Sequence, residues 1–290
     1  MQTLQEMERK LKTVADLQTV VKTMKSMAAV NLRHYEEAAR SLEEYFATVE
    51  LGLRAILRER PPLGRQPLPK EEIVIVFGSD QGMAGRFNDA LLNRIIEDFK
   101  DEKPAGGKRR FWLVGGKALA ALEDSFGPPE HLFPLPPSPD GIADQVQELL
   151  LAFEAHRPQK GDARLTLFHN APTGGIGYGQ QRVTLLPPDR NWLAKLGERR
   201  WPTNQLPHRT LSWEALFGAL LGEYLFAGLY RAFAASMAAE NAARLASMQR
   251  AEKNIEERHG DLTADYHALR QNSISEELSD ILSGFEVLSR

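Results

Sequence analysis

Proline is confined to the middle of this sequence. All 17 prolines lie from Pro61 to Pro207, so residues 1–60 and 208–290 contain none. Proline interrupts the interior of a helix because it removes a backbone hydrogen bond and its ring clashes with the preceding turn. Long unbroken helices are therefore expected only in the two end segments, and residues 70–207 are expected to form a domain of a different kind.

Apolar residues recur along both end segments in alternating steps of three and four residues. This spacing is typical of the seam of a coiled coil, along which one helix is buried against another. The N-terminal series consists of Leu4, Met7, Leu11, Val14, Val21, Met24, Ala28, Tyr35, Leu42, Phe46, Val49, Leu53 and Ile56. The C-terminal series consists of Leu245, Met248, Ile255, Leu262, Tyr266, Leu269, Ile274, Leu278, Ile281, Phe285 and Leu288.

Two such segments at opposite ends of one chain are most simply paired with each other. An antiparallel arrangement lets both helices connect to the same middle domain. The alternative, for either segment taken alone, is an amphipathic helix in an ordinary bundle. We expect residues 1–60 and 208–290 to form one discontinuous, antiparallel coiled-coil shaft.

The C-terminal segment also contains a run of small residues. Small side chains let another element approach closely, but they provide few bulky anchors for packing. We therefore expect this part of the helix to present a smooth shaft surface. The run consists of Ala232, Ala234, Ala235, Ala238, Ala239, Ala242 and Ala243.

The middle domain alternates strand-like and helix-like patterns. Short apolar runs predict strands, and amphipathic spacing predicts helices. Strands that alternate with helices indicate a central open α/β (Rossmann-like) sheet. The predicted strands are residues 72–77, 110–114, 163–169 and 181–186, and the predicted helices are residues 87–99, 117–126 and 142–156.

One glycine-rich loop, Gly78 to Asn88, follows the first predicted strand and precedes a helix. Backbone N–H groups in such a turn can hold a phosphate. A P-loop, however, needs a lysine and a hydroxyl after its last glycine, and here Met83 and Ala84 follow Gly82. We favour a tight strand-to-helix turn that Ser79 or Asp80 caps, with a phosphate site as the alternative.

Composition argues against several kinds of chemistry. The chain has 0 cysteines, and its 7 histidines never fall in H-x-x-x-H spacing, so neither a thiol nucleophile nor a local zinc site is expected. A net charge of -3 provides no basic field for a nucleic acid. No apolar run approaches the roughly 20 residues that span a bilayer. We expect no catalytic residue, no metal and no cofactor.

Positive charge lies beside the apolar seam at Lys22, Lys25, Arg33, Arg244 and Arg250. Ordinary decoration of a coiled coil by charged residues is the interpretation that composition alone favours, and contact with a partner protein is the alternative.

Four blocks of the sequence, in order, resemble the gamma subunit of F-type ATP synthases. They are VVKTMKSMAAVNLR (20–33), GSDQGMAGRFN (78–88), ENAARLASMQRAEKN (240–254) and SISEELSDILSGF (273–285). The chain departs from the family pattern at Ser275 (threonine in the family), at Phe285 (alanine) and at Met83 with Ala84 (leucine and cysteine). These departures indicate a divergent branch, such as the alternative F-type ATPases.

The resemblance implies a rotor subunit without an active site of its own. Its partners would be the alpha and beta subunits, the epsilon subunit and the c-ring, with membrane contact only through the c-ring. It would lie peripherally on the cytoplasmic face of a bacterial inner membrane. By family match, the partner-contact residues would be Met24, Arg244, Arg270, Gln271, Ser275 and Glu277.

Two other classes of function are compatible with the sequence. One is a small-molecule enzyme with its site at the Gly78 loop, which the missing lysine argues against. The other is a coiled-coil scaffold unrelated to rotation. Co-isolation with alpha and beta subunits would distinguish the rotor from both.

Overall fold

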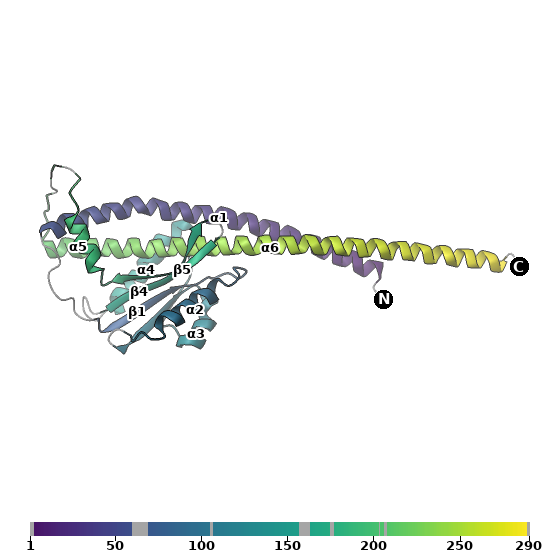
Figure 1. The fold of residues 1–290 in the computed structure, drawn as a ribbon, viewed down its shortest axis with the longest axis horizontal. Coiled ribbons are helices and arrows are strands. Elements are labelled where there is room, and N and C mark those ends of the chain that lie inside the picture. Colours follow the sequence, from purple (N-terminus) through teal and green to yellow (C-terminus); the bar gives the residue numbers. More distant parts are fainter. Residues whose placement is uncertain are drawn as a thin grey trace. The chain divides into compact units, whose positions relative to one another are not determined.

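The computed structural model describes residues 3–59, 69–104, 107–156, 163–174, 177–202, 204–205 and 208–288. The chain divides into two compact units, Met1–Ala28 with Leu245–Arg290, and Ala29–Arg244. Two long helices, α1 (Leu4–Glu59) and α6 (Trp213–Leu288), contribute residues to both units (Figure 1). The outermost prolines, Pro61 and Pro207, lie outside the described residues.

In the unit of residues 3–28 and 245–288, α1 and α6 run antiparallel. Along the polar contacts that join the two helices, residue numbers decrease on α6 as they increase on α1. Met7 and Ala28 of α1 and Met248 and Leu262 of α6 are buried in the seam. The predicted pairing of the two terminal helices is therefore confirmed. The contacts join Glu8 to Tyr266 (2.9 Å), Gln18 to Glu256 (3.4 Å) and Lys25 to Glu252 (2.5 Å).

The predicted C-terminal seam is wrong beyond Leu269. Ile274, Leu278 and Ile281 are 47%, 55% and 65% exposed. The physical reason is the register of the pair. Glu8 contacts Tyr266, and α1 begins four residues before Glu8, so it reaches about residue 270 of α6 at equal helical rise. The side chains of Phe285 and Leu288 lie outside the described residues.

The other unit contains a five-stranded sheet. Its strand order is β3-β2-β1-β4-β5, with β4 and β5 antiparallel and the other neighbours parallel. The open α/β prediction is confirmed, and β3 is an additional short strand. The strands are β1 (Glu71–Phe77), β2 (Arg109–Val114), β3 (His131–Phe133), β4 (Ala163–Gly174) and β5 (Gly177–Leu186).

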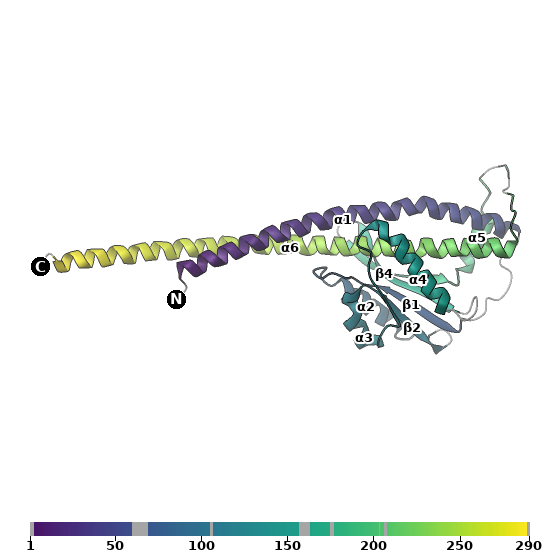
Figure 2. The ribbon, with the colours of Figure 1, turned by 180° about the vertical axis from the view of Figure 1, so that it is seen from behind.

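Helices cover both faces of this sheet. On one face, α2 (Phe87–Phe99) and α3 (Leu119–Phe126) bury side chains against Val74 and Val76. On the other face, α4 (Ile142–His156) approaches Trp112 through Phe153, and α4 is seen from the opposite side in Figure 2. Two short 3-10 turns, η2 (Gly116–Ala118) and η3 (Pro139–Gly141), precede α3 and α4.

A short helix that the sequence did not predict, α5 (Arg190–Glu198), packs on the C-terminal part of α1. Its N-cap residue Asp189 accepts a hydrogen bond from the backbone of Asn191 at 2.9 Å. Its buried Leu193 and Leu196 contact the cluster that contains Leu53 of α1. In this unit α1 and α6 are again antiparallel, since Trp213 donates a hydrogen bond to the Ile56 carbonyl and Tyr45 donates one to Glu223.

The alanine run of α6 lies against the sheet, so the expectation of a smooth shaft surface is wrong. All of the run except half-buried Ala235 is buried. Phe233 stacks edge-on against Phe77 of β1 with ring centroids 4.9 Å apart, and Ser236 Oγ donates a hydrogen bond to the Phe77 carbonyl at 3.3 Å. Small side chains are needed here because they let the helix backbone approach the sheet closely.

Enlarging one buried alanine of this run tests that packing. Ala239 is 0% exposed and packs in a cluster with Ala84 and Phe87. We expect Ala239→Leu to lower the free energy of unfolding by about 2 kcal/mol, because extra methyl groups overpack the site. Urea unfolding of the full chain, followed by circular dichroism, measures this change.

The matched control is Ala264→Leu at an exposed position of the same helix. It should leave the free energy of unfolding nearly unchanged. An equal effect of both substitutions would contradict the close packing of α6 on the Gly78 loop and α2 of the α/β unit.

Candidate partner-contact site

Four of the six predicted contact residues lie exposed on the last part of α6. They are Arg270, Gln271, Ser275 and Glu277. With about 100° of rotation per residue, Arg270 and Glu277 lie about 20° apart around the helix, and Gln271 and Ser275 lie about 40° apart. Ser275 Oγ donates a hydrogen bond to the Gln271 carbonyl at 2.9 Å, which places that pair on successive turns.

An exposed apolar strip lies between these two polar pairs. By the same rotation, Ile274, Leu278 and Ile281 fall between the angular positions of the Arg270 pair and the Gln271 pair. The end of α6 therefore combines an apolar ridge with charged and amide groups on its two sides. Exposed apolar patches rimmed by polar residues are typical of protein interaction sites.

Met24 lies apart from this group. It is half-buried on α1, next to Lys25, which forms the ion pair with Glu252. Glu252 precedes Arg270 by 18 residues, which corresponds to roughly 27 Å along a helix. Met24 therefore lies in a separate part of the helix pair.

Near Met24 lie exposed apolar residues that the sequence analysis did not single out. Leu17, Val20 and Met27 are exposed on α1, and with Met24 they form a second series at three- and four-residue steps. The signal was present in the sequence, because this series runs beside the predicted seam. This second series was not recognised because the predicted seam is the more regular of the two overlapping apolar series.

Arg244 differs from the other predicted contact residues because it is buried. It belongs to the unit of residues 29–244 and is 7% exposed. Its guanidinium donates to Glu240 at 2.5 Å and to Asn241 at 3.3 Å, while its Nε has no partner among the described residues. Arg244 therefore forms an ion pair within its own chain.

The pair of Arg244 and Glu240 also affects its surroundings. Burial raises the pKa of Glu240, and the adjacent guanidinium of Arg244 opposes that rise. Burial and the charge of Glu240 raise the pKa of Tyr35 on α1 to about 12. Tyr35 is thus neutral at physiological pH, and the buried charge is concentrated in the ion pair.

The glycine-rich loop at Gly78 holds strand ends together. Asp80 Oδ1 accepts a hydrogen bond from the Gly116 backbone at 2.6 Å, and Oδ2 accepts one from the Leu135 backbone at 2.8 Å. Asn88 accepts from the Ser79 backbone and donates to the Ser79 hydroxyl. These contacts agree with the interpretation of a tight turn. The expectation that Ser79 or Asp80 caps the helix is wrong, because the N-cap residue of α2 is Arg86, no side-chain hydrogen bond caps that end, and Asp80 instead binds the backbone beyond two strand ends.

Two further features concern the described residues only. Among them, no group of three or more His, Cys, Asp or Glu side chains is placed to hold a metal ion. No helix in the described part of the chain is long and apolar enough to cross a membrane.

A protein-family model described as ATP synthase matches residues 3–288. The ATP synthase gamma chain of Sulfurovum sp. (strain NBC37-1) is 25% identical and covers 99% of both chains. The gamma chain of Acaryochloris marina (strain MBIC 11017) is 27% identical over 100% of both chains.

Solved structures show the same fold. A chain of the Euglena gracilis mitochondrial ATP synthase (OSCP/F1/c-ring, rotational state 3) has a TM-score of 0.65 and 18% identity, and the match covers 98% of this chain and 94% of that chain. A chain of the Tetrahymena thermophila mitochondrial ATP synthase (central stalk/c-ring) has a TM-score of 0.56 and 18% identity, with 80% and 99% covered.

Removing the buried guanidinium tests whether Arg244 serves the fold. We expect Arg244→Met to lower the free energy of unfolding by about 3 kcal/mol, because Glu240 is left as a buried charge without its partner. The double variant Glu240→Gln with Arg244→Met should recover more than half of that loss, since it removes both charges. Urea unfolding of the full chain measures both. Unchanged stability of Arg244→Met would contradict a structural ion pair.

Proposed function

Because the chain belongs to the ATP synthase gamma-chain family, we propose that it is the central-stalk rotor subunit of an F-type ATP synthase. It couples ion flow through the membrane ring to ATP synthesis or hydrolysis at the beta subunits, and it carries no catalytic residue itself. The observation that carries this proposal is the antiparallel pairing of α1 with α6, in a chain that matches the family over residues 3–288.

The helix pair has the properties that a rotating shaft requires. Its register is held by polar contacts at intervals along the seam, from Glu8 with Tyr266 to Lys25 with Glu252. A slip of one helix against the other would break these contacts and the seam together. We propose that residues 1–60 and 208–290 act as the shaft and that residues 70–207 act as the α/β domain at its side.

The end of α6 is the part that we assign to the catalytic partners. Its exposed ridge and its flanking polar residues are asymmetric around the helix axis, so each turn presents a different surface to each surrounding subunit. Arg270 is suited to pair with a partner carboxylate because guanidinium binds carboxylates through several directed N–H groups. Gln271, Ser275 and Glu277 add hydrogen-bonding groups that remain in water until a partner binds.

Two further residues complete the proposed contacts. Met24 and its exposed neighbours on α1 would meet a partner through apolar surface. For Arg244 the proposal carries a condition. Its guanidinium would have to leave Glu240 to meet a partner group, because its Nε is buried.

The proposed partners are the alpha and beta subunits around the shaft, and the epsilon subunit and c-ring beside the α/β domain. No nucleic acid is involved, and the membrane is contacted only through the c-ring. The proposal also places the chain peripherally on the cytoplasmic face of a bacterial inner membrane. Purification of the native complex tests this set, because only the rotor function requires co-isolation with alpha and beta.

The absence of catalysis is tested with the isolated full chain. We expect no saturable binding of magnesium-ATP in calorimetric titration, because the Gly78 loop lacks the lysine and hydroxyl of a P-loop and uses Asp80 to hold two strand ends. Micromolar binding that is lost on Gly82→Val would contradict a purely structural loop.

Coupling is tested by the double variant Arg270→Ala with Gln271→Ala. We expect slower ATP turnover by the purified complex, with normal subunit stoichiometry. Each lost charged hydrogen bond costs roughly 1.5–3 kcal/mol in the rotational states where it forms. Both side chains are exposed, so the helical content of the chain should not change.

The matched control is Arg258→Ala with Asn254→Ala, which likewise removes an arginine and a side-chain amide from exposed positions of α6. Its turnover should equal that of the unchanged complex. Normal turnover of the Arg270 and Gln271 variant would remove these two residues from coupling, and a loss of helicity would assign them to the fold.

A further inference from the structure

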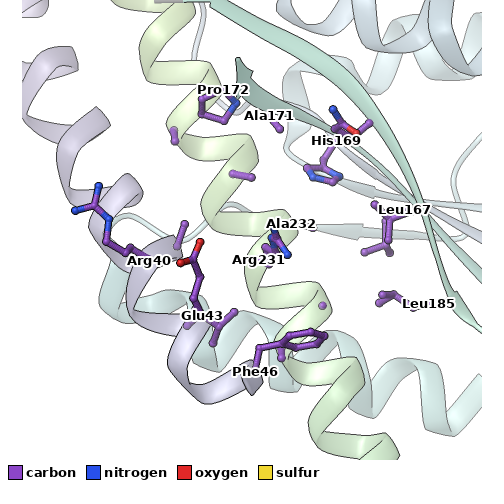
Figure 3. Close-up of a pocket in the computed structure, with 18 of the residues that line it drawn as sticks. Arg40, Glu43, Phe46, Leu167, His169, Ala171, Pro172, Leu185, Arg231 and Ala232 are labelled. Atoms are coloured by element: carbon purple, nitrogen blue, oxygen red, sulfur yellow. The ribbon is translucent and has the colours of Figure 1, made fainter. Parts of the chain in front are cut away.

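A cavity of about 950 Å³ lies between α1, α6 and the β4–β5 hairpin, within the unit of residues 29–244 (Figure 3). Leu42 and Phe46 line it from α1, Leu167 and Leu185 line it from the sheet, and alanines line it from α6. Its size falls within the range of small-molecule binding sites, roughly 300–1,000 Å³.

The cavity exists because three elements meet where α6 has small side chains. β5 is an edge strand, so no further strand fills the space beside it. At the share of about 30 Å³ that each molecule takes in liquid water, the cavity would hold about thirty waters. The aliphatic part of the wall gives the waters beside it few hydrogen-bonding partners, so an apolar group that displaces those waters is favoured.

One wall of the cavity carries a buried polar group. His169 of β4 is 6% exposed and lines the cavity, and its Nδ1 has no partner among the described residues. Burial, and then the positive charge of Arg231, lower the pKa of His169 to about 4. The imidazole is therefore neutral at physiological pH, with one N–H to donate.

Charged groups lie at the rim. Arg231 of α6 and Arg40 of α1 line the cavity, and no ion pair joins either of them to a carboxylate of the described residues within 4.0 Å. Glu36 and Glu43 also line it, from α1. Arg231 is the charge whose field reaches the buried His169. The neutral donor His169 is buried in the wall, and all four charged side chains at the rim are exposed. Of these four, Arg231 is the one whose charge acts on His169, so a ligand group placed at His169 meets a cation.

We propose that this cavity binds an amphipathic carboxylate, with an acyl chain against the aliphatic walls and its carboxylate toward Arg231 and His169. A guanidinium and an imidazole N–H are both donors, and a carboxylate accepts from both. An amphipathic amine would meet these donors with a further cation, and an alcohol would leave the charge of Arg231 without a partner.

The test is calorimetric titration of the full chain with decanoate below its micelle concentration, beside decanol and decylamine. We expect one saturable site for decanoate and at least tenfold weaker binding of the other two. Arg231→Gln should weaken decanoate binding about tenfold or more, as the loss of a charged hydrogen bond does. Ala235→Leu should weaken it by filling the cavity, and leucine suits a helix well.

The matched control is Arg258→Gln, which removes an exposed arginine of the same helix outside the cavity and should leave binding unchanged. The imidazole ¹⁵N resonances of His169 should shift with decanoate in the parent chain and in the control. This readout reports the ligand at the cavity itself.

Three outcomes would overturn the proposal. They are binding that does not saturate, equal affinity for decanol or decylamine, and binding that neither Arg231→Gln nor Ala235→Leu weakens. A fourth outcome comes from the same titration with the purified ATP synthase complex. Loss of decanoate binding in the complex would show that a partner subunit fills the cavity.

Discussion

The close packing of α6 on the sheet is the contact on which the rest of the α/β unit depends. Phe233 packs edge-on against Phe77, and Ser236 donates to the same residue's carbonyl, while alanines on either side let the helix approach. A sheet face this apolar must be covered. Because α6 covers it, α6 belongs both to the α/β unit, as a covering layer, and to the helix pair. α1 packs on the face of α6 that the sheet leaves free. The cavity lies where this small-residue surface meets the β5 edge and no bulky side chain fills the space.

The charged residues of the long helices fall into two groups, one buried and one exposed, and the two groups have different roles. Arg244 and Glu240 are buried together, so their charges compensate each other and Tyr35 stays neutral beside them. Arg270 and Glu277 are exposed and hydrated. An exposed charge costs little to release from a partner, because water replaces the partner at once. A rotating subunit needs exposed charges, which are easily released, where it contacts its partners. Inside its own fold it needs buried charges that compensate each other.

Much of the fold could be predicted from the sequence because its signals are long or regular. The helix limits of α2 and α4 were predicted at the observed residues, and the strands β1 and β2 to within one residue. The strand β3 has three residues, which is too short for a periodic pattern to stand out. The end of β4 and the start of β5 were missed because Pro172 and three glycines interrupt the apolar pattern there, whereas pairing across the hairpin extends both strands.

The sequence by itself determined that two long helices pair and that an α/β sheet lies between them in the chain, since proline placement and apolar periodicity are local properties that any fold must obey. Only the tertiary structure decided which face of α6 meets the sheet, where the seam loses its partner near Leu269, and that Arg244 is buried while Arg270 is exposed. These outcomes depend on register and on contacts between residues far apart in the chain. The same alanine or arginine in the same helical pattern is compatible with either environment until the partner surface is in place.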